Sequence, residues 1–176
     1  MLKQWARPLW FVAALIVPLM TLLAACDRMG GREADTPSGL PVPRYVALAN
    51  GEAAARSGPS DDNRVVAVYH AKGLPVQIVA ETDDWRRICD PEGGLVWVKK
   101  RLVDGHRTVM RIKPGPVAIY RRPSQSAGVA GWLAPRALAA LDRCDKGWCK
   151  VRAGGVKGWT PQSEVWGAEP APQCRG

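Results

Sequence analysis

The chain has 176 residues, a formal net charge of +9, eight tryptophans and one phenylalanine. This length allows one domain of ordinary size or two small ones. The excess of lysine and arginine argues against basic partners and favours anionic ones, namely lipid headgroups, acidic cell-wall polymers or acidic proteins. A charged surface also keeps a small domain soluble, so the charge alone does not select among these partners.

Residues 1–25 have the layout of an export signal. Lys3 and Arg7 give a positive start, residues 9–23 form an apolar run, and small residues precede Cys26. The apolar run would span about 22 Å as a helix, less than the ~30 Å hydrocarbon core of a bilayer, which argues against a permanent transmembrane helix. We therefore expect an exported, periplasmic protein that does not meet nucleic acid.

The end of this signal, Leu-Ala-Ala-Cys at 23–26, resembles the lipobox of bacterial lipoproteins. The resemblance implies that Cys26 becomes the lipid-modified N-terminus, which would attach the protein to a membrane. An ordinary cleavage site prefers a small residue where this chain has Leu23. Ordinary cleavage to a soluble periplasmic protein and an uncleaved anchor remain alternatives.

Residues 26–44 are rich in glycine and proline and have no apolar periodicity. Such a segment buries too little surface to offset its ordering entropy, so we predict a flexible linker. It would serve as a tether that holds the folded part away from a membrane, or it is an N-terminal segment without a selected role.

Short runs rich in β-branched and aromatic residues follow, separated by turn clusters such as Asp-Pro-Glu-Gly-Gly at 90–94. This pattern predicts antiparallel strands. The expected strands of the first half are residues 65–69, 75–80, 85–89 and 95–99.

A second series begins with residues 111–120. Residues 137–141 have helical propensity, but their alignment with residues 75–80 favours a strand. The other expected strands of this series are 128–133, 148–152 and 156–160.

The two series are copies of one unit. The interval from Trp85 to Trp148 equals that from Trp97 to Trp159 within one residue. Self-similarity at this period indicates two small domains, each near the smallest size that folds on one core. We expect the domains at 45–105 and 106–167, followed by a tail over 168–176.

The motifs of both copies resemble bacterial SH3-like (SH3b) domains, in particular the tandem exported proteins of proteobacteria. The resemblance covers residues 45–167 and implies an all-β fold of two tandem small SH3-like β-barrels that bind cell-wall peptide or glycan. Val96 replaces the usual glycine before the late tryptophan of the first copy, and residues 122–124 lack a Gly-Pro step in the second. Any groove formed by the opening loop is therefore expected to differ between the copies. The matching segments are 55–60, 73–78, 85–88, 94–98, 144–151 and 158–160.

Four cysteines follow Cys26, and an even number in an exported chain favours disulfides. Cys144 and Cys149 flank a tight turn, where a cross-strand pair lies within disulfide range. By elimination Cys89 pairs with Cys174, although free thiols or another pairing stay open. A four-cysteine zinc site is a rival, but the spacing lacks the usual pairs of closely spaced ligands, so we expect no metal.

The tryptophans at repeat positions, Trp85, Trp97, Trp148 and Trp159, are predicted to fill the cores. Tyr69 and Trp132 each end a strand and are better candidates for an exposed aromatic platform. Basic clusters at residues 99–101 and at Arg121 and Arg122 concentrate the positive charge. The candidate binding surface is Tyr69, Trp132, Arg121 and Arg122.

We find no catalytic constellation or cofactor motif. His70 and His106 lie in or beside turns without the partners that a triad requires. The sequence therefore favours a non-enzymatic binding module of the cell envelope, and the SH3-like resemblance implies that it recognises cell-wall peptide or glycan. The alternative is a protein–protein adaptor in the envelope without affinity for the wall.

Overall fold

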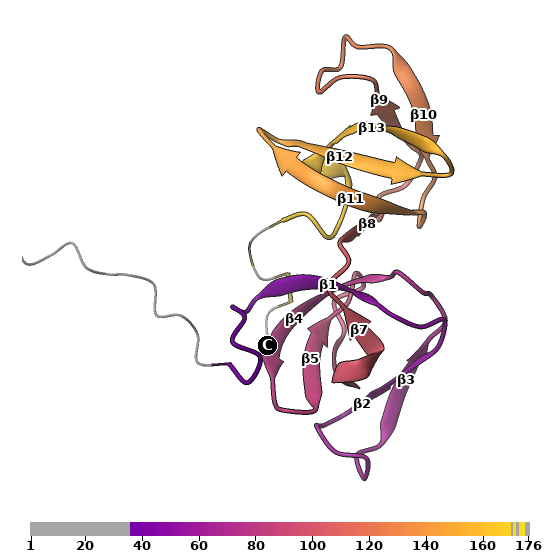
Figure 1. The fold of residues 1–176 in the computed structure, drawn as a ribbon. Coiled ribbons are helices and arrows are strands. Elements are labelled where there is room, and N and C mark those ends of the chain that lie inside the picture. Colours follow the sequence, from indigo (N-terminus) through magenta and orange to yellow (C-terminus); the bar gives the residue numbers. More distant parts are fainter. Residues whose placement is uncertain (1–35, 170, 172, 175–176) are drawn as a thin grey trace, which may run out of the picture. The chain divides into compact units, whose positions relative to one another are not determined.

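The computed structural model describes residues 36–169, 171, 173 and 174 (Figure 1). The predicted signal and the lipidated Cys26 lie outside these residues. Within them, every regular element is a β-strand or a short 3-10 turn, and all strand pairs are antiparallel. The all-β prediction is confirmed.

The first sheet has seven strands in the order β3-β2-β6-β5-β4-β1-β7. A 3-10 turn, η1, connects the last two strands of the domain in the chain. The elements are β1 (Arg44–Leu48), β2 (Ala53–Arg56), β3 (Val65–Tyr69), β4 (Pro75–Glu81), β5 (Trp85–Cys89), β6 (Leu95–Lys99), η1 (Lys100–Leu102) and β7 (Val103–Asp104).

The second sheet has six strands in the order β10-β9-β13-β12-β11-β8. Of residues 137–141, all but Ala137 belong to strand β11, so the expectation of a strand there is confirmed despite the helical propensity. The elements are β8 (Thr108–Met110), β9 (Val117–Tyr120), β10 (Val129–Leu133), β11 (Leu138–Asp145), β12 (Trp148–Ala153), β13 (Val156–Pro161) and η2 (Gln162–Glu164).

Both sheets are open, whereas closed barrels were expected. Strands β3 and β7 end the first sheet, and β10 and β8 end the second. The two small tandem β domains of the prediction are nevertheless present, each with its own sheet. The open edges leave β3 and β10 with backbone groups available for further pairing.

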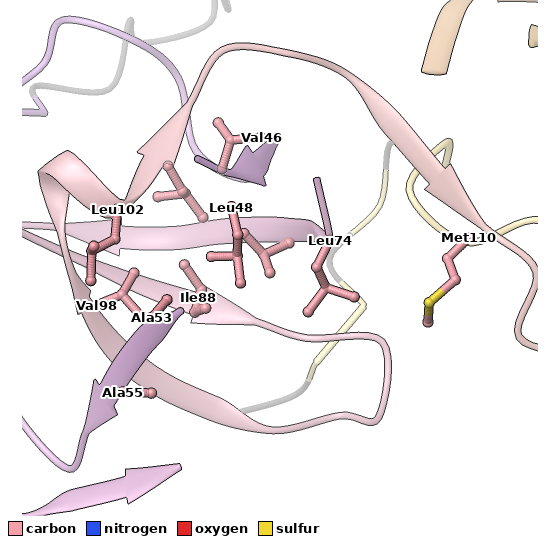
Figure 2. Packing of buried hydrophobic residues seen from close by; sticks show 11 residues of the cluster. Val46, Leu48, Ala53, Ala55, Leu74, Ile88, Val98, Leu102 and Met110 are labelled. Atoms are coloured by element: carbon pink, nitrogen blue, oxygen red, sulfur yellow. The ribbon is translucent and has the colours of Figure 1, made fainter. Parts of the chain in front are cut away.

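Each sheet packs aliphatic side chains on its inner face. The first cluster includes Leu48, Ile88 and Val98 (Figure 2), and the second includes Ile119 and Val151. Alternate residues of a strand point to opposite faces, so the neighbours of these residues lie on the outer face. The inner faces define where each core sits.

This alternation corrects the core prediction for Trp97, Trp148 and Trp159, whereas Trp85 is buried as expected. Trp85, Trp97, Trp148 and Trp159 lie on the outer faces, since their strand neighbours Arg86, Val98, Cys149 and Thr160 occupy inner positions. Trp85 is buried at 7% exposure, but the other three are only half-buried. Neither aliphatic cluster includes any of the four. Valine, isoleucine and leucine fill the cores in their place.

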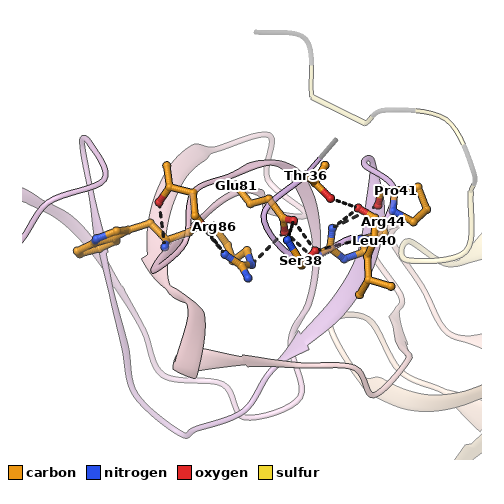
Figure 3. A network of polar contacts seen from close by, with 9 residues as sticks. Thr36, Ser38, Leu40, Pro41, Arg44, Glu81 and Arg86 are labelled. Carbon is orange, nitrogen blue, oxygen red and sulfur yellow. Dashed lines mark hydrogen bonds and ion pairs between the residues drawn. The ribbon is translucent and has the colours of Figure 1, made fainter. Parts of the chain in front are cut away.

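A buried carboxylate attaches the segment before β1 to the first sheet (Figure 3). The Glu81 side chain is 0% exposed and lies 2.6 Å from Arg44 Nη2 and 3.1 Å from Arg86 Nε. Ser38 donates to Glu81 through both its backbone N–H and its hydroxyl. The part of the predicted linker that the structure describes is therefore held against β4.

Burial by itself would raise the pKa of Glu81. Hydrogen bonds from Ser38 and Arg44 outweigh that effect and lower the pKa to about 2. The carboxylate is thus charged at any pH above the acid range, and its three partners stay engaged.

Residues 171, 173 and 174, near the end of the chain, contact the outer face of the first sheet. They belong to the same compact unit as the two sheets. Gln77 is 1% exposed and uses both amide atoms: its Nε2 donates to Ala171 O, and its Oε1 accepts from Gln173 N, each at 2.9 Å. Trp166 meets Tyr45 edge-on at 5.1 Å. Cys174 is bonded to Cys89. The described residues of the tail are therefore part of the folded structure.

Candidate ligand-binding surfaces

A groove of about 630 Å³ opens on the first domain. Its walls come from the β2–β3 loop, the β4–β5 turn and the junction of β6 with η1. The lining residues are Asp61, Asp84, Trp85, Lys99, Lys100, Arg101 and Val103.

Backbone pairing sets the positions of these side chains. Trp85 stands opposite Lys99 in the β5–β6 register. Lys100 N donates to Asp84 O at 2.8 Å, which fixes η1 against the β4–β5 turn. The groove is therefore built on the framework of the sheet, and its charged side chains project from fixed backbone.

Lys99 links the two walls of the groove. Its Nζ lies 2.7 Å from Asp61 Oδ2 and 5.6 Å from the centroid of the Trp85 ring. The hydrogen bond from Lys99 lowers the pKa of Asp61 below its usual value. Lys100, Arg101 and Asp84 are exposed around this pair. A groove with both signs of charge above an indole suits a short ligand that has both amino and carboxylate groups.

The second domain repeats the backbone of this site without its charges. Trp148 stands opposite Pro161, and Gln162 N donates to Gly147 O at 2.8 Å, as Lys100 N does to Asp84 O. Pro161, Gln162 and Ser163 occupy the places of Lys99, Lys100 and Arg101. The grooves therefore differ between the copies, as expected, because only the first has charged side chains at these positions.

The predicted surface residues are distributed over both sheets. Trp132 is 64% exposed on β10, and Arg121 and Arg122 are exposed in the turn between β9 and β10. Tyr69 belongs to the first sheet and is half-buried; its hydroxyl donates to Asp90 Oδ2 at 2.6 Å. Burial and this hydrogen bond raise its pKa. The structure therefore does not join Tyr69 to Trp132 in one platform.

The groove residues were only partly visible in the sequence. The basic cluster at 99–101 was identified as a concentration of charge, but Asp61 and Trp85 were not connected with it. Asp61 is 38 residues from Lys99 in the chain, and the pairing of distant strands brings them together. The run of basic residues at 99–101 was the signal of this groove that the sequence offered.

The structure places both cysteine pairs at disulfide distance. Cys144 and Cys149 are opposite each other in the β11–β12 register, with Cα atoms 4.0 Å apart. Cys89 and Cys174 have Cα atoms 5.7 Å apart. Disulfides form and persist in oxidising compartments, which favours a location outside the cytoplasm. Within the described residues, no group of three or more His, Cys, Asp or Glu side chains is arranged to hold a metal ion.

Two small antiparallel domains in tandem, the first of which has a charged groove beside a tryptophan, define a protein of small β domains. Residues 49–105 and 113–167 each match the family model of the bacterial SH3 domain. These matches cover more than half of the chain, and the chain belongs to this family.

Among solved structures, the chain is similar to NlpC2 and NlpC1 from Trichomonas vaginalis. The identities are 13% and 11%, the TM-score is 0.34 for each, and the matches cover 76% and 74% of this chain. They cover 51% and 49% of those chains, so the protein spans about half of their length. Likenesses at this level say nothing about the ligand of this chain.

No curated protein matches the chain. In the part that the structure describes, no helix is both long enough and apolar enough to cross a membrane.

Proposed function

We propose that the protein is a non-enzymatic binding module of the bacterial envelope that recognises cell-wall peptide through the groove of its first domain. The protein is exported and attached to a membrane through a lipid on Cys26. Its family and its two disulfides support an extracytoplasmic role.

The observation that carries the proposal is the composition of the groove. Lys99 is held between Asp61 and the Trp85 ring, while Lys100 and Arg101 are exposed at the rim. Wall peptides present free carboxylates and amines on short flexible chains. Such groups pair with the rim cations and with Asp84, while the apolar parts of the peptide contact the indole edge.

Pelleting with isolated peptidoglycan tests the proposal. The mature chain with Cys26→Ser is expected to sediment with peptidoglycan at moderate salt. The double variant Lys99→Gln/Lys100→Gln is expected to lose most of this binding. Lys72→Gln is the matched control because Lys72 is an exposed lysine of the same domain outside the groove. Absence of pelleting by the mature chain would overturn wall binding.

The lipid anchor has its own test. Cys26→Ser is expected to move the protein from the membrane fraction to the soluble periplasmic fraction. Unchanged fractionation would contradict lipidation at Cys26.

One observation favours the second candidate, an adaptor for another envelope protein. Strand β3 is an edge of the first sheet and exposes Val65, Val66 and Val68 at 43%, 41% and 43%. An apolar edge strand can accept an added strand from a partner. Crosslinking from the native envelope through a photoreactive residue at position 66 would capture such a partner, whereas crosslinks only to wall fragments would favour the first candidate.

A further inference from the structure

The outer face of the second sheet gathers aromatic and basic side chains. In the register, Trp159 of β13 stands opposite Tyr120 of β9 and Lys150 of β12, and Lys150 stands opposite Arg143 of β11. Residues paired across strands point to the same face, so all four are on one side of the sheet. The opposite side holds the core residues Ile119, Cys149 and Val151.

Two more aromatic residues belong to the same side. Trp132 stands opposite Ala118, which is two positions from Tyr120 and therefore on the same face of β9. Trp148 is two positions from Lys150 and meets Tyr120 edge-on, with ring centroids 5.7 Å apart. The outer face of the second domain thus includes Tyr120, Trp132, Trp148, Trp159, Arg143 and Lys150.

The cations of this face are held against an indole. Arg143 Cζ lies 5.3 Å and Lys150 Nζ 5.9 Å from the centroid of the Trp159 ring. Both share a single carboxylate, Asp142, at 3.9 Å, which is too distant to neutralise either strongly. Their charges remain available to an anionic ligand.

Further along β12 and β13, Arg152 and Lys157 stand opposite each other and are exposed. Asp145 stands opposite Trp148 at the other end. Four cations therefore share the face and its border with two aspartates, and the local charge is positive.

Among the residues that the structure describes, the face that is covered in the first domain is exposed in the second. The positions of Arg152 and Lys157 correspond to Cys89 and Leu95, which are also opposite each other in their sheet. There the face is occupied, because Cys89 is bonded to Cys174 and Leu95 packs in the same cluster as Cys174. The second sheet has exposed cations where the first sheet receives the tail.

We propose that the outer face of the second domain binds a sugar chain that carries carboxylate groups. The flat apolar side of a pyranose ring stacks on an indole such as the exposed Trp132, and carboxylates pair with Arg143 and Lys150. Five adjacent strands, from β10 to β11, contribute to the face, which therefore extends over about 19 Å at the usual strand spacing. This length suits a polymer of several sugars. The inference rests on the proposed function for the source of the ligand, the cell wall.

Binding of defined polymers to the mature chain with Cys26→Ser, with disulfides intact, tests the inference by calorimetry. The probes are oligogalacturonate, a chito-oligosaccharide of equal length as the uncharged sugar, and polyglutamate as the acidic chain without sugar. Oligogalacturonate is expected to bind best. Arg143→Gln/Lys150→Gln is expected to weaken it at least tenfold, and Trp132→Ala severalfold. Both changes affect exposed or partly exposed side chains, so the melting temperature should not change.

The groove variant Lys99→Gln/Lys100→Gln is the matched control and should bind oligogalacturonate normally. Equal binding of polyglutamate, together with no effect of Trp132→Ala, would overturn the inference and indicate a surface for acidic proteins. Absence of oligogalacturonate binding would also overturn it, while peptidoglycan pelleting would leave the proposed function standing. If the mature chain failed to pellet with peptidoglycan but still bound oligogalacturonate, only the proposed function would be rejected, and this inference would stand.

Discussion

The two domains of this protein share a backbone and differ in what they present on it. The hydrogen bond from Lys100 N to Asp84 O in the first domain recurs as Gln162 N to Gly147 O in the second, both at 2.8 Å. The charges of the first groove are absent from the second. Conversely, the tail covers one outer face, and the equivalent residues of the other domain are exposed cations. A duplicated fold therefore does not imply a duplicated site.

The largest expected effect is the difference between the two disulfides in their contribution to the free energy of unfolding. Cys89–Cys174 closes a loop across 85 residues and Cys144–Cys149 across 5. On the chain-entropy model the long loop contributes about 4–5 kcal/mol to the free energy of unfolding and the short one about 2 kcal/mol. Urea unfolding of Cys89→Ala/Cys174→Ala and Cys144→Ala/Cys149→Ala measures both. A smaller loss for the first variant would show that the tail is not a stabilising part of the fold.

The second effect compares the loss of stability when an ion pair is removed from each domain: Glu81 with its arginines in the first, and Glu164 with Arg111 in the second. Glu81→Gln leaves Arg44 and the buried Arg86 without their carboxylate, and we expect a loss of about 3 kcal/mol. Glu164→Gln is the matched variant. It removes the partner of Arg111 and Lys113, but Glu164 is 30% exposed and Arg111 keeps backbone acceptors at Pro114 and Gly115, so about 1 kcal/mol is expected.

The pH dependence of stability has a definite sign. The pKa of Glu81 is depressed in the folded protein, so the unfolded chain binds the proton more tightly. The contribution of Glu81 is complete above about pH 4.5 and is lost as the pH falls toward about 2. Chemical unfolding at several pH values should show this slope in the parent chain and a weaker slope in Glu81→Gln. An identical slope in both would contradict the role of the carboxylate.

A further effect tests a difference in backbone packing between the two domains. Gly158 of the second domain corresponds to Val96 of the first. A Cβ at Gly158 would lie 2.4 Å from Tyr120 O and 2.7 Å from Ile119 Cγ2, so β9 or β13 must shift. We expect Gly158→Ala to cost about 2 kcal/mol, within the range for overpacking. Gly51→Ala is the control, because a Cβ at Gly51 would have nothing within 4 Å, and little effect on stability is expected. Gly154 cannot serve as a control position, because its φ is positive and any side chain there would be strained.

The strand pattern was predictable because it depends on local signals. Turn clusters such as residues 90–94 separate runs whose residues prefer extended backbone, and the strands at 65–69, 85–89 and 95–99 have the expected bounds. The direction of each side chain was harder to predict. Tryptophan was expected in the cores because it is large and apolar, yet strand parity places Val98 and Cys149 inside and their tryptophan neighbours outside.

Contacts between distant segments were not readable from spacing. Gln77 and Glu81 look like ordinary exposed polar residues of a strand, but they hold the tail and the segment before β1. The pairing of Cys89 with Cys174 was reached by elimination and implied that the tail folds back over the first domain, but the face that the tail covers and its contacts with Gln77 could not be predicted. The basic cluster at 99–101 was visible, whereas its partners Asp61 and Trp85 depend on the β2–β3 loop and the β5–β6 register.

The bond between Cys89 and Cys174 makes a covalent ring of everything between them, and this ring contains the whole second sheet. A protease that cuts once in the connection at residues 105–107 would leave the fragments joined, and they would separate on a gel only after reduction. The second domain is thus protected against detachment by one cut in this connection.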